Sequence, residues 1–243
     1  MTDESGATQL QMVHRLPKAP LVNRIEFLRE RAVGRRVIHL GFADAGFRDM
    51  QSRSDAWLHE HLSRVTTSLV GIDIEDDGVQ LARDLGYEAY QANACRVEEL
   101  EALQLEPAEL VIAGEVIEHL EDPGAFLRAL AVLVEPGGEL IVTTPNSHGL
   151  INIAATLVGR EINHPDHLVM YTWRTLSTLM ERTGWTVSES ATYVAAVKET
   201  GAATAAERAM VIGAKAALAA EKGLSRLGAH FAADGLIIAA TRT

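Results

Sequence analysis

Cysteine, aromatic residues and long apolar runs are all scarce in this sequence of 243 residues. Cys95 is the only cysteine, which excludes an internal disulfide and a zinc site built from several thiolates, and fits a reducing cytoplasm. Aromatic residues make up 5% of the chain, so no stacking stripe for flat substrates is evident. No apolar run reaches the roughly 20 residues that cross a bilayer, and the acidic Asp3 and Glu4 do not resemble a secretory signal. We therefore expect a cytoplasmic protein with no membrane span.

Basic residues are also in deficit. The chain has 22 Lys and Arg against 33 Asp and Glu, which gives a net charge of −11. A surface this acidic repels the phosphates of nucleic acids, so it disfavours a nucleic-acid partner. Hydrophobic residues at 47% and charged residues at 23% are ordinary for a globular protein and exclude a mainly disordered chain.

Short β-branched segments alternate with helical patterns along the chain. The predicted strands are Arg36–Leu40, Ser68–Asp73, Glu88–Tyr90, Glu109–Ala113, Glu139–Thr144, Val187–Tyr193 and Leu236–Thr241. The predicted helices cover 23–32, 55–65, 76–86, 97–103, 122–134, 173–183 and 202–230. Most of the strands are nearly continuous in apolar residues, as expected when helices cover both faces of a sheet. This alternation predicts an α/β fold with a doubly wound, mostly parallel sheet.

Three turns after the predicted strands carry candidate ligand residues. In a doubly wound fold, ligands bind at the carboxyl ends of the strands. Gly41 is the only glycine in the turn from Gly41 to Ala45, which is either a ligand loop or an ordinary turn. Asp73 ends the second strand and is either a ribose acceptor or a helix N-cap. Asn93 follows the third strand, where its amide either reads an adenine edge or is solvated.

The strongest motif begins at the fourth strand. It reads ELVIAGEVIEHLEDP over Glu109–Pro123 and continues through Pro136-Gly137-Gly138 to Thr143-Thr144-Pro145-Asn146. His164-Pro165-Asp166-His167 and Tyr171-Thr172 follow. Over about residues 34–193 the chain resembles a class I S-adenosylmethionine-dependent methyltransferase, similar to the O-methyltransferases of ubiquinone biosynthesis and of sugar and polysaccharide pathways.

This resemblance implies a Rossmann-like, seven-stranded sheet whose last strand is antiparallel. It also implies that the chain binds S-adenosyl-L-methionine. In that case Gly41, Phe42 and Ala43 contact the methionine part and Asp73 binds the ribose. The adenine lies between Ile74, Asn93 and Ala94, and Glu115 lies under the sulfonium. The sequence departs from the family pattern at three positions, because His39 replaces the usual acid and Ala43 and Ala45 replace loop glycines. These departures keep open a non-catalytic binding or scaffold module as an alternative.

Glu115, Glu118 and His119 stand at i, i+3 and i+4, which would place them on one face of a helical turn. Two carboxylates and an imidazole suit Mg²⁺ or Mn²⁺, with His167 or His164 as a further ligand. The spacing also resembles the metal site of small-RNA 2′-O-methyltransferases. We predict Glu118, His119 and His167 as catalytic residues. Without a metal, His119 is a candidate general base, or the group only braces the loop.

The acceptor is the least defined partner. We expect one methyltransferase domain over 1–243, with an N-terminal arm and helix at 1–33, a cofactor-binding core at 34–146 and acceptor-side segments with the closing strands at 147–243. The predicted reaction is O-methylation of a small hydroxylated molecule such as a sugar, a polysaccharide precursor, a natural product or a phenol. The apolar helix over 202–230 suits a lid or a homo-oligomer interface. A nicotinamide oxidoreductase is a weaker alternative, because the first turn lacks a three-glycine fingerprint.

Overall fold

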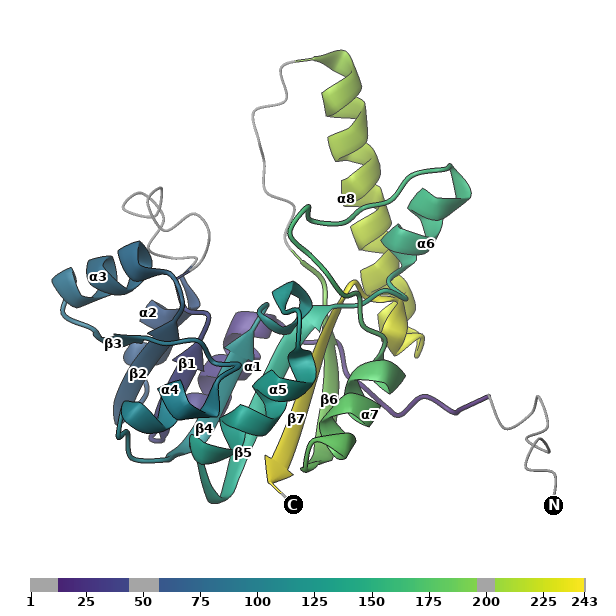
Figure 1. The fold of residues 1–243 in the computed structure, drawn as a ribbon. Helices are drawn as coiled ribbons and strands as arrows, with labels where there is room; N and C mark the ends of the chain where they lie inside the picture. The colour runs from purple at the N-terminus through teal and green to yellow at the C-terminus, as the bar shows by residue number, and fades with distance from the viewer. Residues whose placement is uncertain (1–12, 44–56, 196–203, 243) are drawn as a thin grey trace, which may run out of the picture.

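The computed structural model describes residues 13–43, 57–195 and 204–242, and a seven-stranded sheet runs through them (Figure 1). The strand order is β3-β2-β1-β4-β5-β7-β6. The strands are β1 (Arg36–Leu40), β2 (Ser68–Asp73), β3 (Glu88–Gln91), β4 (Ala108–Gly114), β5 (Val134–Pro145), β6 (Trp185–Tyr193) and β7 (Gly235–Arg242). The pairs among β1 to β5 are parallel, and β7 is antiparallel to both of its neighbours. The predicted doubly wound sheet with an antiparallel last strand is confirmed.

Helices cover both faces of the sheet, which explains the continuous apolar strands. In β1, Val37 packs with α1 (Arg24–Ala32) and α2 (Leu58–Ser63), whereas Ile38 and Leu40 pack on the opposite face with α4, α5 and α7. The last three helices are α4 (Val97–Ala102), α5 (Pro123–Ala129) and α7 (Trp173–Arg182), and α3 (Asp76–Asp84) packs beside β2 and β3. Because side chains alternate between the two faces, every second residue of a central strand joins the other core.

The strand order reverses at β1, which lies between β2 and β4. The connections from these strands then leave in opposite directions and open a crevice at the carboxyl ends. The residues after β1, β2 and β4 therefore share one edge of the sheet, where the sequence places its candidate ligand residues.

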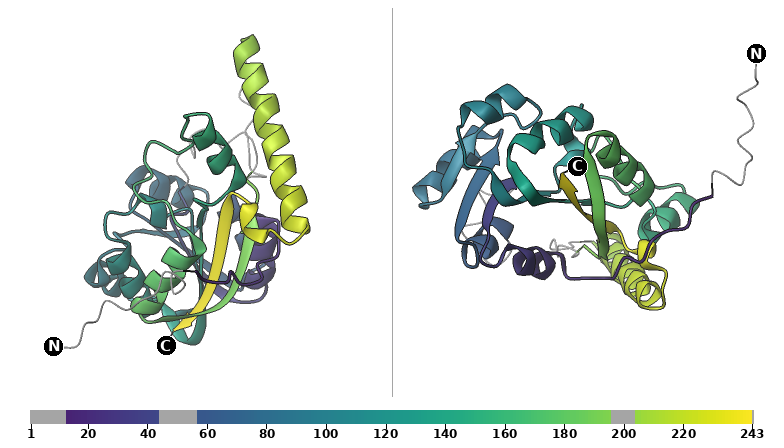
Figure 2. Two further views of the ribbon diagram at one scale, coloured as in Figure 1. Left: turned by 90° about the vertical axis from the view of Figure 1, so that its right-hand side faces the viewer. Right: turned by 90° about the horizontal axis from the view of Figure 1, so that it is seen from below.

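Two helices extend beyond this edge. α8 (Ala205–Arg226) rises away from the sheet with α6 (Leu150–Leu157) against its side (Figures 1 and 2). The helix predicted over 202–230 corresponds to α8, and Gly228 with a φ of 106° follows its end, as is typical of helix termini. α6 was not predicted. Within the described residues, no helix is long and apolar enough to cross a membrane.

The helix predicted over 122–134 is wrong in its second half. α5 ends at Ala129 and is followed by a short 3₁₀ turn, η5 (Leu130–Val132). The chain joins the sheet earlier than predicted, because Val134 already pairs with Ala108 across a register shift. The Pro-Gly-Gly turn that was expected to precede β5 therefore lies within it.

Candidate active site

The turn after β1 needs glycine at its first position. Gly41 has a φ of 63°, and a Cβ there would lie 2.1 Å from the Val116 side chain. The Gly41 amide donates to the carbonyl of Ile72, which fixes the turn beside β2. The backbone can adopt this conformation and approach Val116 only without a side chain.

Asp73 holds the same loop from β2. Its carboxylate accepts hydrogen bonds from the Ala43 amide at 2.9 Å and from the Glu75 amide at 3.1 Å. Burial raises the pKa of Asp73, although both amides favour the charged carboxylate. Asp73 is therefore at the predicted edge and also tethers the loop. Ala45, the other loop alanine, lies outside the described residues.

The Phe42 ring is buried away from the loop surface. It packs against Trp57 and His59, and its carbonyl accepts a hydrogen bond of 2.8 Å from the Trp57 indole. Gly71 makes room for the ring, because a Cβ there would lie 2.7 Å from it. Any contact between this position and a cofactor therefore involves the Phe42 backbone.

Beneath the loop, His39 forms a buried pair with His59. The two Nδ1 atoms lie 3.2 Å apart and the rings stack. Burial lowers the pKa of both histidines, so both are neutral near pH 7. A pair of neutral rings thus occupies the position where the family pattern has an acid.

An open cavity of about 390 Å³ lies beside the ends of β2 and β3. Its lining residues are Ile74, Gln91, Ala92, Asn93, Arg96 and Glu99. Ile74 is 59% exposed and offers an apolar surface, while the Asn93 side chain accepts a hydrogen bond from the Cys95 amide. The structure thus brings together Ile74 and Asn93, whereas Ala94 packs against the core instead of lining the cavity.

Glu115 follows β4 in an unusual backbone conformation. Its φ is 58°, a left-handed value that costs a non-glycine residue about 1–2 kcal/mol. The carboxylate accepts hydrogen bonds from Tyr193 at 2.6 Å and from Thr143 at 2.7 Å. The Arg24 guanidinium lies 3.9 Å from it and over the Tyr193 ring.

This cluster of Arg24, Glu115, Thr143 and Tyr193 was missed in the sequence, apart from Glu115. Its members come from α1, the end of β4, β5 and β6. Gly114 and Gly235 make room for the cluster, because a Cβ at Gly114 would collide with Arg24 and a Cβ at Gly235 would collide with Tyr193. Such collisions can be recognised only once the elements are placed in space.

Among the residues that the structure describes, Glu118, His119 and His167 form a group that could hold a metal ion. Their ligand atoms all lie within 4.8 Å of one another. Glu118 and His119 belong to a 3₁₀ turn, η4 (Ile117–His119), and the Leu168 amide donates to the Glu118 carbonyl, which brings His167 alongside. Glu115 is outside this group, because it precedes the turn and its carboxylate is held by Tyr193 and Thr143. The prediction that all the residues of the motif share one helical face is wrong at Glu115.

The hydrogen bonds of the two imidazoles fix their tautomers. His119 Nδ1 lies 3.1 Å from the Asp166 carbonyl, and His167 Nδ1 lies 2.8 Å from the Asn163 side-chain oxygen. Both oxygens only accept, so each Nδ1 donates and each Nε2 keeps a free lone pair. Burial and the neighbouring His119 and His164 lower the pKa of His167, which keeps it neutral.

Glu118 is 1% exposed, and one of its carboxylate oxygens has no partner among the described residues. The other oxygen accepts from the Thr144 hydroxyl at 2.9 Å. Burial and the nearby Glu115 raise the pKa of Glu118 to about 8. A buried carboxyl in this state is either protonated or neutralised by a cation.

The chain matches the methyltransferase domain family over residues 14–190. It is 32% identical over 150 residues to a ubiquinone biosynthesis O-methyltransferase of Caulobacter vibrioides, covering 57% of each chain. It is 28% identical over 142 residues to the human mitochondrial ubiquinone biosynthesis O-methyltransferase, covering 54% of this chain and 38% of the relative. The chain spans about half the length of the curated relatives it matches.

Solved structures show the same fold at low identity. A magnesium protoporphyrin IX methyltransferase from Synechocystis with bound SAH, the demethylated cofactor, has a TM-score of 0.54 and 12% identity, covering 90% of this chain and 82% of that one. A SAM-dependent methyltransferase from Archaeoglobus fulgidus has a TM-score of 0.51 and 17% identity, covering 89% of this chain and 93% of that one.

Proposed function

The chain belongs to the class I S-adenosylmethionine-dependent methyltransferases, and from this we propose that it transfers the cofactor's methyl group to a hydroxyl oxygen of a small acceptor. One observation carries the proposal. The cofactor candidates after β1, β2 and β3 lie at the same sheet edge as the group of Glu118, His119 and His167 that follows β4. Methyl transfer needs a donor pocket beside groups that prepare an oxygen nucleophile.

We assign the donor to the edge formed by β1, β2 and β3. Asp73 holds the loop and offers its carboxylate to the ribose, and Ile74 with Asn93 borders the cavity that takes the adenine. Gly41 and the backbone of Phe42 and Ala43 then lie against the methionine part. Glu115 would lie nearest the donor's sulfonium, because its negative charge favours a cation nearby.

The acceptor hydroxyl must lose its proton as the oxygen attacks the methyl carbon in line with the sulfonium. His119 reaches solvent and has a free Nε2, so it is the residue we propose to accept that proton. The carbonyl of Asp166 holds its ring in the required tautomer. His167 and Glu118 lie beside it and orient the acceptor oxygen.

We further propose that Glu118, His119 and His167 hold a divalent cation, Mg²⁺ or Mn²⁺. The residues fit this role, since one ligand atom from each lies within 4.8 Å of the others and one Glu118 carboxylate oxygen has no partner among the described residues. When bound, such an ion lowers the pKa of a coordinated hydroxyl and favours acceptors with two neighbouring oxygens. His119 would then serve as a ligand instead of a base, and the acidified hydroxyl would release its proton to solvent at this exposed site.

Radiolabelled methyl transfer tests the function directly. Purified protein with labelled S-adenosylmethionine is offered catechols, sugars and simple phenols, with and without Mg²⁺ or Mn²⁺, while calorimetry measures S-adenosylhomocysteine binding. Cofactor binding with transfer to a hydroxyl supports the proposal. Cofactor binding without transfer to any acceptor favours the non-catalytic module, which the loop alanine Ala43 motivates.

The remaining assignments are also proposals. We treat 1–243 as one methyltransferase domain, with the cofactor core at 34–146 and acceptor-side segments after it. We retain a cytoplasmic location from the single cysteine and homo-oligomer formation through α8 as predictions. The acidic composition continues to favour a small-molecule acceptor over a nucleic acid.

A further inference from the structure

A second cavity, of about 300 Å³, lies between the chain preceding α1, the end of β6 and the last turns of α8. Its lining residues are Leu21, Val22, Asn23, Val194, Lys222 and Arg226. The wall is fixed by the sheet, because the Val22 amide donates to the Thr192 carbonyl and the Thr192 amide donates to the Pro20 carbonyl. A cavity of this size suits a molecule with one ring or a short chain.

Two residues that line this cavity are chain neighbours of residues in the cluster around Glu115. Asn23 directly precedes Arg24, and Val194 directly follows Tyr193. Tyr193 donates to Glu115, and Arg24 lies over the Tyr193 ring. In the strand order, β4 and β5 separate the cofactor edge at β1, β2 and β3 from β7 and β6, where this cavity lies. A molecule here therefore lies on the side of β4 that is opposite the donor edge.

The cavity carries two positive charges. Lys222 and Arg226 stand four residues apart on α8, which places them on one face of the helix. Both side chains are exposed, and among the described residues neither forms a salt bridge. Lys222 also lies near Asp234, whose pKa it lowers while burial raises it. In a chain with a net charge of −11, two cations on one small cavity favour an anionic ligand.

We infer that Lys222 and Arg226 hold an acidic group of the methyl acceptor, a carboxylate or a phosphate, in this cavity. The inference rests on the proposed function, since it places the acceptor's hydroxyl toward Glu115 and His119. It narrows the substrate class from hydroxylated molecules in general to hydroxylated acids. The apolar Leu21, Val22 and Val194 then contact the carbon skeleton that links the two groups.

Ligand binding tests the inference without requiring the natural acceptor. Calorimetry with the full chain and saturating S-adenosylhomocysteine measures benzoate, phenyl phosphate and the neutral benzyl alcohol. We expect at least one anion to bind about tenfold or more tightly than the alcohol, and raised salt to reduce the difference. The two anions distinguish a carboxylate site from a phosphate site.

Matched variants identify the residues. Lys222→Gln combined with Arg226→Gln should remove the preference for the anion, whereas Lys222→Arg should retain it. Arg182→Gln is the control, because Arg182 is an exposed arginine at the end of α7, beside the amino end of β6. Circular dichroism verifies that each variant is folded.

Three results would overturn the inference: equal binding of acids and alcohol, no binding of the acids, or an unchanged preference in the folded double variant. Its failure is separable from that of the proposed function. If S-adenosylhomocysteine binds and a neutral acceptor is methylated while the acids show no preference, only the inference about the acidic group is wrong. If the cofactor does not bind, the proposed function fails in the same samples.

Discussion

At the scale of single residues, the most informative group is the Glu118 carboxyl. It is buried and one of its oxygens has no partner among the described residues, so a proton or a cation must neutralise its charge. Near pH 7, a carboxyl with a pKa raised to about 8 is mostly protonated. A divalent cation favours the ionised form, so its binding should release a proton. The proposed metal site therefore predicts that metal binding and proton release are linked at this residue.

We expect Mn²⁺ to raise the melting temperature of the wild-type protein and to release protons on binding, measured by calorimetry in buffers of different ionisation enthalpy. His119→Ala and His167→Ala each remove a ligand nitrogen and should weaken Mn²⁺ binding by about 10- to 100-fold. His148→Ala, an exposed histidine after β5, is the control. Equal Mn²⁺ affinity in all four proteins would eliminate the metal site.

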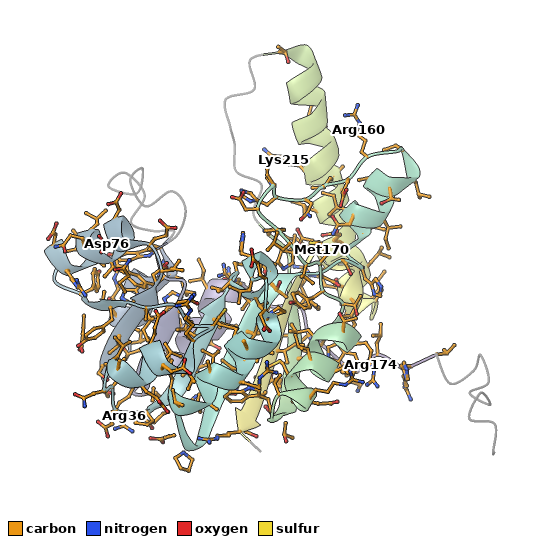
Figure 3. The ribbon with its side chains drawn as sticks, in the orientation of Figure 1. Arg36, Asp76, Arg160, Met170, Arg174 and Lys215 are labelled. Atoms are coloured by element: carbon orange, nitrogen blue, oxygen red, sulfur yellow. The ribbon has the colours of Figure 1, made fainter. Side chains whose placement is uncertain are left out.

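Asp73 is tested by its effect on the cofactor. Asp73→Asn keeps the side-chain volume but turns one acceptor oxygen into a donor that faces the Ala43 or the Glu75 amide. We expect S-adenosylhomocysteine affinity to fall by about 1–3 kcal/mol, measured by calorimetry. Asp76→Asn alters an exposed acid of α3, seen in Figure 3 at the other end of the sheet from α8, and should bind normally. Unchanged affinity in Asp73→Asn would contradict the assigned role.

The sequence motif predicted Glu118, His119 and His167, and the structure brings these three together. The motif could not predict the position of Glu115. An argument from residue spacing assumes a regular helix, whereas Glu115 adopts a left-handed backbone conformation. The helix predicted over 55–65 likewise gives no indication that His59 is fully buried against His39. Spacing along a chain reports neighbours within an element and not the contacts that elements make with each other.

At the scale of elements, the loop after β1 and helix α3 pack closely because each has a small residue where they meet. Ala43 replaces a glycine of the family pattern, and Gly78 stands opposite it in α3. A Cβ on Gly78 would lie only 2.4 Å from the Cβ of Ala43. The helix thus lacks a side chain where the loop carries one, which explains how the loop accommodates the alanine.

This contact predicts that a second substitution restores the stability that a first substitution removes. Gly78→Ala should destabilise the protein by about 1–3 kcal/mol, because the two Cβ atoms collide, despite the preference of helices for alanine. Adding Ala43→Gly removes the collision and should restore stability to the wild-type value or above it. Urea unfolding measures each variant. Gly213→Ala in α8 is the control, because a Cβ at Gly213 would meet no neighbouring side chain or backbone within 4 Å, and it should not destabilise the protein. A double variant no better than Gly78→Ala would refute the complementarity.

Most elements could be predicted because the periods of apolar residues report which faces are buried. The predicted bounds of β1 and β2 match the structure, since buried parallel strands are short apolar runs between polar turns. The helix α6 was missed, because Leu150–Leu157 is apolar on most sides and lacks a capping side chain. Its position is set by α8, from a distant part of the chain, so the local pattern gives little indication of it.

At the scale of the whole molecule, α8 is attached to the rest of the protein through a buried acid. Glu221 is 0% exposed and accepts a hydrogen bond of 2.7 Å from the Ile151 amide near the start of α6. Its second carboxylate oxygen has no partner among the described residues. Burial raises the pKa of Glu221 from 4.5 to about 7. The folded protein therefore holds this proton more tightly than the unfolded chain does.

The sign of the pH effect follows from this difference. Below about pH 4.5 Glu221 is protonated in both states, and its contribution to stability is fully present. Between pH 4.5 and 7 the unfolded chain loses the proton first, so the free energy of unfolding falls as the pH rises. Above pH 7 the folded protein bears a buried charge whose full cost lowers its stability. Glu221→Gln keeps an oxygen for the Ile151 amide and cannot ionise.

We therefore expect Glu221→Gln and the wild type to have similar stability at pH 4.5, and the variant to be more stable by about 1–3 kcal/mol at pH 8. Urea unfolding at a series of pH values measures the free energy of unfolding of both proteins. Subtracting one from the other cancels the contributions of all other titrating groups. Glu181→Gln, an exposed acid of α7, should give a flat difference. A flat difference for Glu221→Gln as well would show that its carboxyl titrates equally in both states, and that α8 is not held by a proton-dependent contact.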